Sequence, residues 1–351
     1  MNNNRYKKYY KFILKSVVLS AAFLLLFVII GTAWIWLTTR QKEVEFNNGS
    51  IVLRGTLLSP RFADKTPGIV FVHGSGQTSR KSMMLYAWIF AAKGYSALAY
   101  DKRGVGKSDG GITEWRDFSF NDLANDAAAA YRFLQSETSS DPDHIGFFGA
   151  SQGGWVVSLA ASRVDPPAFV IMVSASVSTV AEDRIYGREA QVRYSGFGED
   201  AVNQAVELIK LDHQVTRSAQ WYDSLLTKWN SYRTQSWFND VYQDDTPLPI
   251  NDPHRKWERT ILDYDPQPYL ENIKAPVLWI FGDPALDRFS PVKLSISRIE
   301  KAKDAGMPYQ IIQINNVGHT IEPQDGNKIK TLLQIRIPLI RKIFQWLENQ
   351  Q

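Results

Sequence analysis

A serine flanked by glycines stands between a predicted strand and a predicted helix, and this stretch constrains the fold more than any other. The apolar run that begins at Ile145 ends at Gly149, and a helix-compatible segment, residues 156–162, begins soon after Gly153. A serine on such a turn has strained backbone geometry that lifts its Oγ clear of the sheet, and the crowded turn favours glycine on both sides. The N–H groups at the start of the helix point at the serine. The pattern Gly149-x-Ser151-x-Gly153 therefore predicts that Ser151 is a nucleophile. The alternative is a small-residue turn that only packs a helix on a strand.

Apolar runs alternate with helical segments along most of the chain. A hairpin is expected around Asn47-Asn-Gly-Ser50. Apolar runs, typical of strands buried on both faces, are found at 68–72, 95–100, 145–149, 168–174 and 276–281, and a further strand is expected at 309–314. Helical segments are found at 83–92, at 120–135, from about 291, and at 330–347. This alternation predicts an α/β fold with a mostly parallel sheet and helices on both faces.

The alternation stops between residues 175 and 270. This segment has helical stretches such as 200–211 and many aromatic residues, but no apolar strand. It is too long to be a plain connection. We therefore expect a helical cap at 175–270, inserted into an α/β core formed by residues 43–174 and 271–351. Most of the aromatic side chains are expected to build the cap's own core.

The N-terminus combines a basic stretch with a long uncharged segment. Residues 1–15 hold five Lys or Arg and no acidic residue, and residues 16–39 carry no charge. A helix of this uncharged length extends about 36 Å, which is enough to cross a bilayer. The pattern predicts a basic cytoplasmic tail at 1–15, a transmembrane anchor at 16–39 and a catalytic domain on the extracytoplasmic side. A cleaved signal peptide is one alternative, although its apolar core would be shorter. A cytoplasmic catalytic domain is another, which the basic N-terminus disfavours.

The composition excludes several kinds of chemistry. The 351 residues include no cysteine, so disulfides, thiolate metal sites and a cysteine nucleophile are ruled out. The formal net charge of +4 is not clustered outside the N-terminus, so no nucleic-acid partner is expected.

A serine nucleophile needs a histidine base that a carboxylate orients. His319 follows the last predicted strand, at the carboxyl edge of the sheet where Ser151 also lies, and we predict that it is the base. The other histidines occupy less suitable positions: His73, His144, His213 and His254. Two carboxylates compete for the acid in the loop after residue 281. We favour Asp287, four residues before the helix-opening Pro291, over Asp283, which is followed by a proline that restricts its backbone.

These motifs resemble those of the α/β-hydrolase superfamily over about residues 44–347. The resemblance rests on the order Ser–Asp–His along the chain and on the following stretches: His73-Gly-Ser-Gly76, Asp101-Lys-Arg-Gly-Val-Gly-Lys-Ser108, Gly149-x-Ser151-x-Gly153 and Gly318-His319. Within the superfamily the chain is most similar to the serine-aminopeptidase, monoacylglycerol-lipase and prolyl-oligopeptidase-like groups. One departure is that the acid loop is longer than the family's usual Gly-x-x-Asp arrangement.

The resemblance implies roles for residues outside the Ser–His–Asp set. It implies an oxyanion hole formed by the backbone N–H groups of Ser75 and Gln152, and a structural role for Asp101 and Arg103. No metal or cofactor is expected. The sequence as a whole predicts a membrane-anchored serine hydrolase that cleaves a carboxylic acyl bond, an ester above all, through an acyl-enzyme intermediate.

Several alternatives share this sequence pattern. A peptidase, an aminopeptidase or a thioesterase would use the same three residues, because the cap selects the substrate and the triad does not. The expected substrate is thus a small-molecule or peptide acyl compound. The alternative from another class is a catalytically inactive hydrolase-fold domain that serves as a binding module at the membrane.

Overall fold

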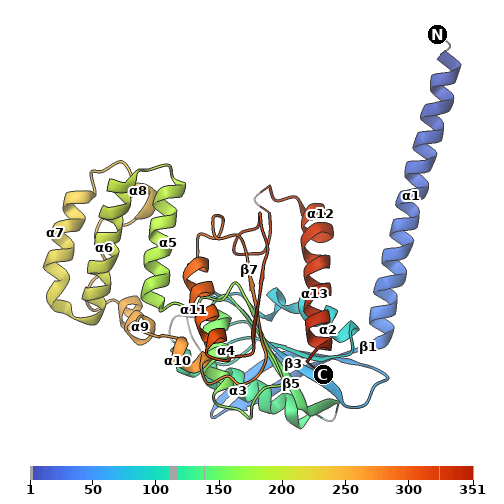
Figure 1. Cartoon of the computed structure of the whole chain (residues 1–351), viewed down its shortest axis with the longest axis horizontal. Helices are drawn as coiled ribbons and strands as arrows, with labels where there is room; N and C mark the ends of the chain where they lie inside the picture. The colour runs from blue at the N-terminus through green and yellow to red at the C-terminus, as the bar shows by residue number, and fades with distance from the viewer. Residues whose placement is uncertain (1–2, 111–117, 138, 324, 351) are drawn as a thin grey trace.

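The computed structural model describes residues 3–110, 118–137, 139–323 and 325–350. A mixed sheet forms the centre of the fold, with the order β1-β2-β4-β3-β5-β6-β7-β8 (Figure 1). β1 pairs with β2, and β2 with β4, in antiparallel fashion, whereas every later pair in this order is parallel. The strands are β1 (Thr39–Asn48), β2 (Ile51–Pro60), β3 (Thr66–Val72), β4 (Ser96–Tyr100), β5 (Ser140–Ala150), β6 (Val170–Val173), β7 (Val277–Phe281) and β8 (Tyr309–Gln313).

Helices cover both faces of this sheet, which confirms the predicted fold class. One core lies between the sheet and α2 (Met84–Ala92) and α13 (Ile337–Glu348). The other lies between the sheet and three helices, α3 (Phe120–Ser136), α4 (Gln152–Ala161) and α11 (Val292–Asp304). Every residue of β4 and of β7 is buried. The central strands are buried on both faces, and this explains why they are continuously apolar in the sequence.

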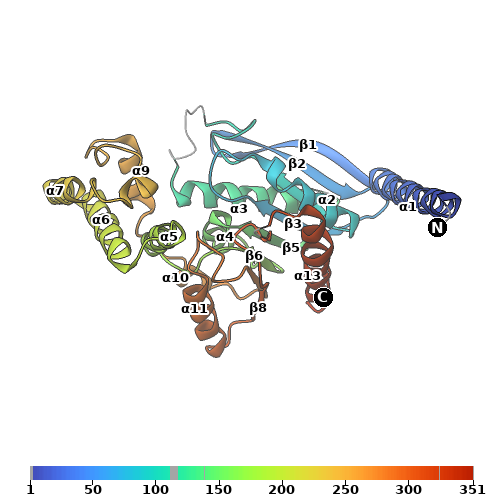
Figure 2. The same ribbon diagram turned by 90° about the horizontal axis from the view of Figure 1, so that it is seen from above.

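A group of helices connects β6 to β7 and projects to one side of the sheet (Figures 1 and 2). These helices are α5 (Val180–Tyr194), α6 (Glu199–Arg217), α7 (Tyr222–Tyr232), α8 (Phe238–Val241), α9 (Pro253–Ile261) and α10 (Gln267–Leu270). The segment has a small core of its own, in which Trp229, Trp237 and Phe238 are buried beside Leu208 and Leu225. The other cap aromatics include Trp221, which is exposed.

A single helix, α1 (Asn3–Thr38), leads into β1 and extends away from the sheet (Figure 1). Trp34 and Trp36 are each 68% exposed. Within the described part of the chain, no helix combines the length and the apolar character needed to cross a membrane. The predicted anchor at 16–39 therefore gains no support from the described residues. Several of its side chains, among them those of residues 23–25 and 27–29, lie outside that part.

Two helices differ from their expected bounds. α4 begins at Gln152 rather than near residue 156, because tight packing at Gly153 and Gly154 outweighs the low helix propensity of glycine. A Cβ on Gly153 would lie 2.2 Å from the carbonyl oxygen of Val72. The segment expected to be one helix at 330–347 consists of α12 (Lys328–Lys330), the π-helical η4 (Thr331–Arg336) and α13. Pro338, near the start of α13, has no N–H with which to continue an α-helical hydrogen-bond ladder.

Candidate active site

Ser151 occupies the turn between β5 and α4. Its backbone has φ +52° and ψ −122°, in a region that residues other than glycine rarely adopt. A Cβ on Gly149 would come within 2.8 Å of the carbonyl oxygen of Gly153, so no larger residue fits there without a shift. This sharp, strained strand-to-helix turn is the geometry that exposes a nucleophilic serine at the edge of an α/β sheet.

Three of the predicted site residues meet through hydrogen bonds, although they are far apart in the chain. The Nε2 atom of His319 lies 2.9 Å from Ser151 Oγ. On the other side of the ring, Nδ1 lies 3.0 Å from Asp287 Oδ2 and 3.2 Å from Oδ1. A carboxylate only accepts hydrogen bonds, so Nδ1 carries the proton. Nε2 is then free to accept the hydroxyl proton of Ser151.

The loop after β7 places Asp287, and not Asp283, against the histidine. Asp287 is 1% exposed, and its Oδ1 accepts backbone hydrogen bonds from Phe289 at 2.9 Å and Ser290 at 3.0 Å. Asp283 instead accepts from the backbone N–H of Ala285 at 2.9 Å, within its own turn. The backbone carbonyl of Asp283 also accepts from the N–H of Asp287, at 2.9 Å. The extra length of the acid loop is therefore one closed turn, and this turn presents the second carboxylate to the imidazole.

Ser151 and His319 open into a cavity of about 430 Å³ between the sheet edge and the cap. Ser75 and Gln152, which the resemblance implied as oxyanion-hole residues, line the same cavity. Gln152 is the first residue of α4, so its backbone N–H is one of those at a helix start that have no partner within the helix. The cap contributes Trp257 to the wall.

Lys102 is a site residue that the sequence analysis missed. Its side chain is buried, and its Nζ donates to the carbonyl oxygen of Gly74 at 2.6 Å and to Gln152 Oε1 at 2.9 Å. Burial lowers the pKa of Lys102 to about 7. The Gly74 carbonyl and the Ser75 N–H belong to one planar trans peptide, in which they point in opposite directions. Lys102, together with His73 Nδ1 at 3.1 Å from the same carbonyl oxygen, therefore holds the direction of the Ser75 N–H. The sequence shows only that Lys102 stands two residues after the end of the buried strand β4, which does not distinguish it from a surface lysine.

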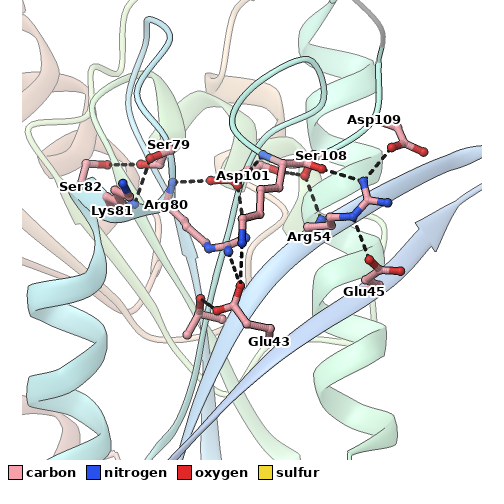
Figure 3. A network of polar contacts seen from close by, with 12 residues as sticks. Glu43, Glu45, Arg54, Ser79, Arg80, Lys81, Ser82, Asp101, Ser108 and Asp109 are labelled. Atoms are coloured by element: carbon pink, nitrogen blue, oxygen red, sulfur yellow. Dashed lines mark hydrogen bonds and ion pairs between the residues drawn. The ribbon is translucent and has the colours of Figure 1, made fainter.

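The neighbours of Lys102 make contacts that hold loops together. Asp101 accepts from the backbone N–H of Arg80 at 2.7 Å and from its guanidinium at 3.2 Å, and Arg80 also pairs with Glu43 of β1 (Figure 3). Arg103 pairs with the buried Asp126 of α3 at 2.6 and 2.7 Å. These ion pairs tie the end of β4 to the hairpin and to α3.

Strand order, the Ser151 turn and the chain order of the three polar residues are together those of an α/β-hydrolase. Residues 64–304 match the family model for the serine aminopeptidases S33. The chain belongs to this family, which confirms the resemblance and identifies the protein as an α/β-hydrolase enzyme.

Individual sequence relatives match a smaller share of the chain than the family model does. The quorum-quenching protein AidA of Acinetobacter baumannii is 31% identical over 129 residues, which are 37% of this chain and 42% of AidA. The alignment with AidA thus spans less than half of the length of AidA. The thiohydrolase apmlB of Arthrinium phaeospermum is 28% identical over 60% of this chain and 77% of its own length. An esterase of Pyrococcus furiosus superposes with a TM-score of 0.57 at 16% identity, over 89% of this chain and 92% of the esterase. At that identity the superposition shows the fold alone.

Proposed function

We propose that the protein is a serine hydrolase that cleaves a carboxylic acyl bond, an ester above all, through an acyl-enzyme intermediate. The observation that carries this proposal is the position of His319, which bridges Ser151 and Asp287 beside an open cavity. Its substrate is a small-molecule or peptide acyl compound.

The proposed reaction uses this chain's own groups. Ser151 Oγ attacks the acyl carbonyl carbon while His319 Nε2 takes the hydroxyl proton, and Asp287 stabilises the imidazolium that results. The backbone N–H groups of Gln152 and Ser75 stabilise the negative oxygen of the tetrahedral intermediate. When that intermediate collapses, His319 returns the proton to the leaving group. A water molecule, activated by the same histidine, then hydrolyses the acyl-enzyme and restores the serine.

Thioester and peptide substrates are the second candidate. A relative named as a thiohydrolase and a family named for aminopeptidases favour testing both. Rates with matched acyl esters, thioesters and aminoacyl amides would rank the three bond types. A fluorophosphonate probe would distinguish the enzyme from an inactive binding module, because only an activated serine becomes labelled.

Lys102 is proposed as a positioning residue for the oxyanion hole. In Lys102→Met, the Gly74–Ser75 peptide and the Gln152 side chain lose their common donor. We expect kcat to fall by about 10²-fold with KM nearly unchanged, because one oxyanion donor contributes about 10²–10³ to turnover. Steady-state kinetics with an acyl ester would measure both constants.

The control for this variant is Lys107→Met. Lys107 lies in the same loop with its side chain 70% exposed, and its weak pairing with Glu43 leaves the cavity untouched. Lys107→Met should keep the normal kcat. An unchanged kcat in folded Lys102→Met would show that Lys102 has no positioning role.

We further propose that the N-terminus anchors the enzyme in a membrane, with the catalytic domain on the extracytoplasmic side. The uncharged segment 16–39 after a basic tail supports this. Deleting residues 1–38 is expected to release a folded, active domain from the membrane fraction, because β1 begins only at Thr39.

Sedimentation and ester hydrolysis of the full and shortened chains would test the anchor, and protease accessibility in spheroplasts would test the side. A shortened chain that cannot fold would show that α1 belongs to the core. A full-length chain that stays in the supernatant would also overturn the proposal.

A further inference from the structure

A second, larger cavity lies within the cap and adjoins the one at Ser151. Its volume is about 710 Å³, and its walls come from α5, α6, α9 and the loop after β7. Asp183, Arg184 and Phe289 line both cavities. A substrate whose acyl bond lies at Ser151 can therefore extend into this second cavity.

The charges that face the second cavity do not balance. Three arginines line it, Arg184, Arg188 and Arg288, together with the carboxyl groups of Asp183, Asp212 and Glu258. Glu258 pairs with Arg184, and Asp212 pairs with Arg255, which lies behind the wall. Burial raises the pKa of Asp183 to about 7, so this group is partly neutral near pH 7. Arg188 and Arg288 have no carboxylate partner among the described residues.

Aromatic rings and backbone groups hold the two unpaired guanidinium groups in place. The Arg188 guanidinium lies 4.3 Å from the centre of the Tyr242 ring, and its Nη1 donates to the carbonyl oxygen of Val241 at 2.8 Å. The Arg288 guanidinium lies 3.7 Å from the centre of the Tyr194 ring. Cation–π contacts leave the edge N–H groups of a guanidinium free to bind an anion. Arg288 also directly follows Asp287 in the chain, so it connects this cavity to the catalytic loop.

Buried nitrogen atoms without hydrogen-bond partners gather around the same cavity. Among the described residues they include Arg188 Nε, His213 Nε2 and His254 Nδ1, and all three residues line the cavity. His213 is 2% exposed, and burial lowers its pKa to about 4, so its ring is neutral at pH 7. Buried polar atoms without a partner are few in native proteins, and these three make the wall of the cavity polar without reaching its interior.

We propose that the second cavity, which lies within the cap, binds a carboxylate on the part of the substrate that is remote from the cleaved bond. Arg188 and Arg288 would hold this carboxylate, since a guanidinium binds a carboxylate through two parallel N–H···O bonds. The inference rests on the proposed function at Ser151 and narrows its substrates to acyl compounds that carry a second, ionised carboxyl group.

The kinetic test compares two series of p-nitrophenyl esters. One series consists of monoesters of straight-chain dicarboxylic acids, and the other of the same compounds with the free carboxyl group methylated. At low ionic strength we expect the wild type to prefer the best ionised ester by at least about tenfold in kcat/KM, mostly through KM. Arg188→Gln and Arg288→Gln should each lower this preference about tenfold. Two variants are used because Arg188 also ties α5 to the end of α8.

The matched control is Arg193→Gln. Arg193 lies on the same helix α5, but it pairs with Glu199 at the surface and does not line the cavity. This variant should keep the full preference. A wild type that hydrolyses both series equally at every chain length would overturn the inference, as would a preference that survives in both folded arginine variants.

A binding measurement separates this inference from the proposed reaction. Monomethyl suberate and dimethyl suberate are titrated into Ser151→Ala, with and without Arg188→Gln, and tryptophan fluorescence or calorimetry reports binding without turnover. Monomethyl suberate, which keeps one free carboxylate, should bind at least about tenfold more tightly than dimethyl suberate, and Arg188→Gln should abolish the difference. If this difference appears but neither ester series is hydrolysed, the carboxylate site stands and the hydrolase proposal fails. Equal binding of the two esters would overturn the carboxylate site.

Discussion

Ser151→Ala is expected to lower turnover of any substrate by about 10⁶-fold, as in triad knockouts of other hydrolases. The reason is that no other hydroxyl is shown within hydrogen-bond reach of His319 Nε2 in the described structure. Alanine lacks only the Oγ atom, so the strained turn at φ +52° should persist and the fold should remain intact. Initial rates would measure the loss of turnover, and circular dichroism would show whether the fold is intact.

The matched control is Ser162→Ala, at the exposed end of the same helix, where the hydroxyl donates only to the carbonyl of Leu159. This variant should keep normal activity and fluorophosphonate labelling, whereas Ser151→Ala should lose both. Near-normal turnover in folded Ser151→Ala would refute the assignment of the nucleophile.

Asp287→Asn is expected to lower turnover by about 10⁴-fold. In the wild type, Oδ1 accepts two backbone N–H groups, and Oδ2 faces His319 Nδ1 at 3.0 Å. The asparagine oxygen should keep the backbone bonds, because its NH₂ group cannot accept them. The NH₂ group would then face Nδ1 and favour the tautomer with the proton on Nε2. That tautomer cannot take the proton of Ser151.

Asp283→Asn is the control for this substitution. Its side chain caps a turn through Ala285 and does not contact the imidazole, so most of the activity should remain. Equal losses in both variants would indicate damage to the loop rather than a wrong tautomer. Activity retained in Asp287→Asn would remove Asp287 from the proposed mechanism.

Local patterns in the sequence were enough to predict much of the fold. The hairpin turn follows from Asn48-Gly49, because Gly49 adopts a φ of +60° that glycine accepts without strain. Buried parallel strands need continuous apolar runs, so β3, β4 and β7 were visible without any tertiary contact. Errors occurred where packing outweighed local preference, as at Gly153 and Gly154 in the first turn of α4.

The candidate site likewise has some features that follow from the local sequence and others that only the tertiary structure shows. The sequence by itself predicted the Ser151 turn and narrowed the predicted base to His319, because a motif and the residues that follow a strand end are visible in consecutive positions. Only the tertiary structure decided which aspartate meets His319, because a closed turn between Asp283 and Asp287 sets the direction of each carboxyl group.

Lys102 and the cap arginines depended on the tertiary structure even more. Lys102 lies 50 positions from Gln152, and Arg188 lies 53 from Val241. Contacts over such separations leave no periodic or local signal in one sequence, because they arise only when separate elements pack together. In the sequence alone, a buried lysine and an arginine without a carboxylate partner therefore look like ordinary surface charges. Their neighbours become known only from the folded structure.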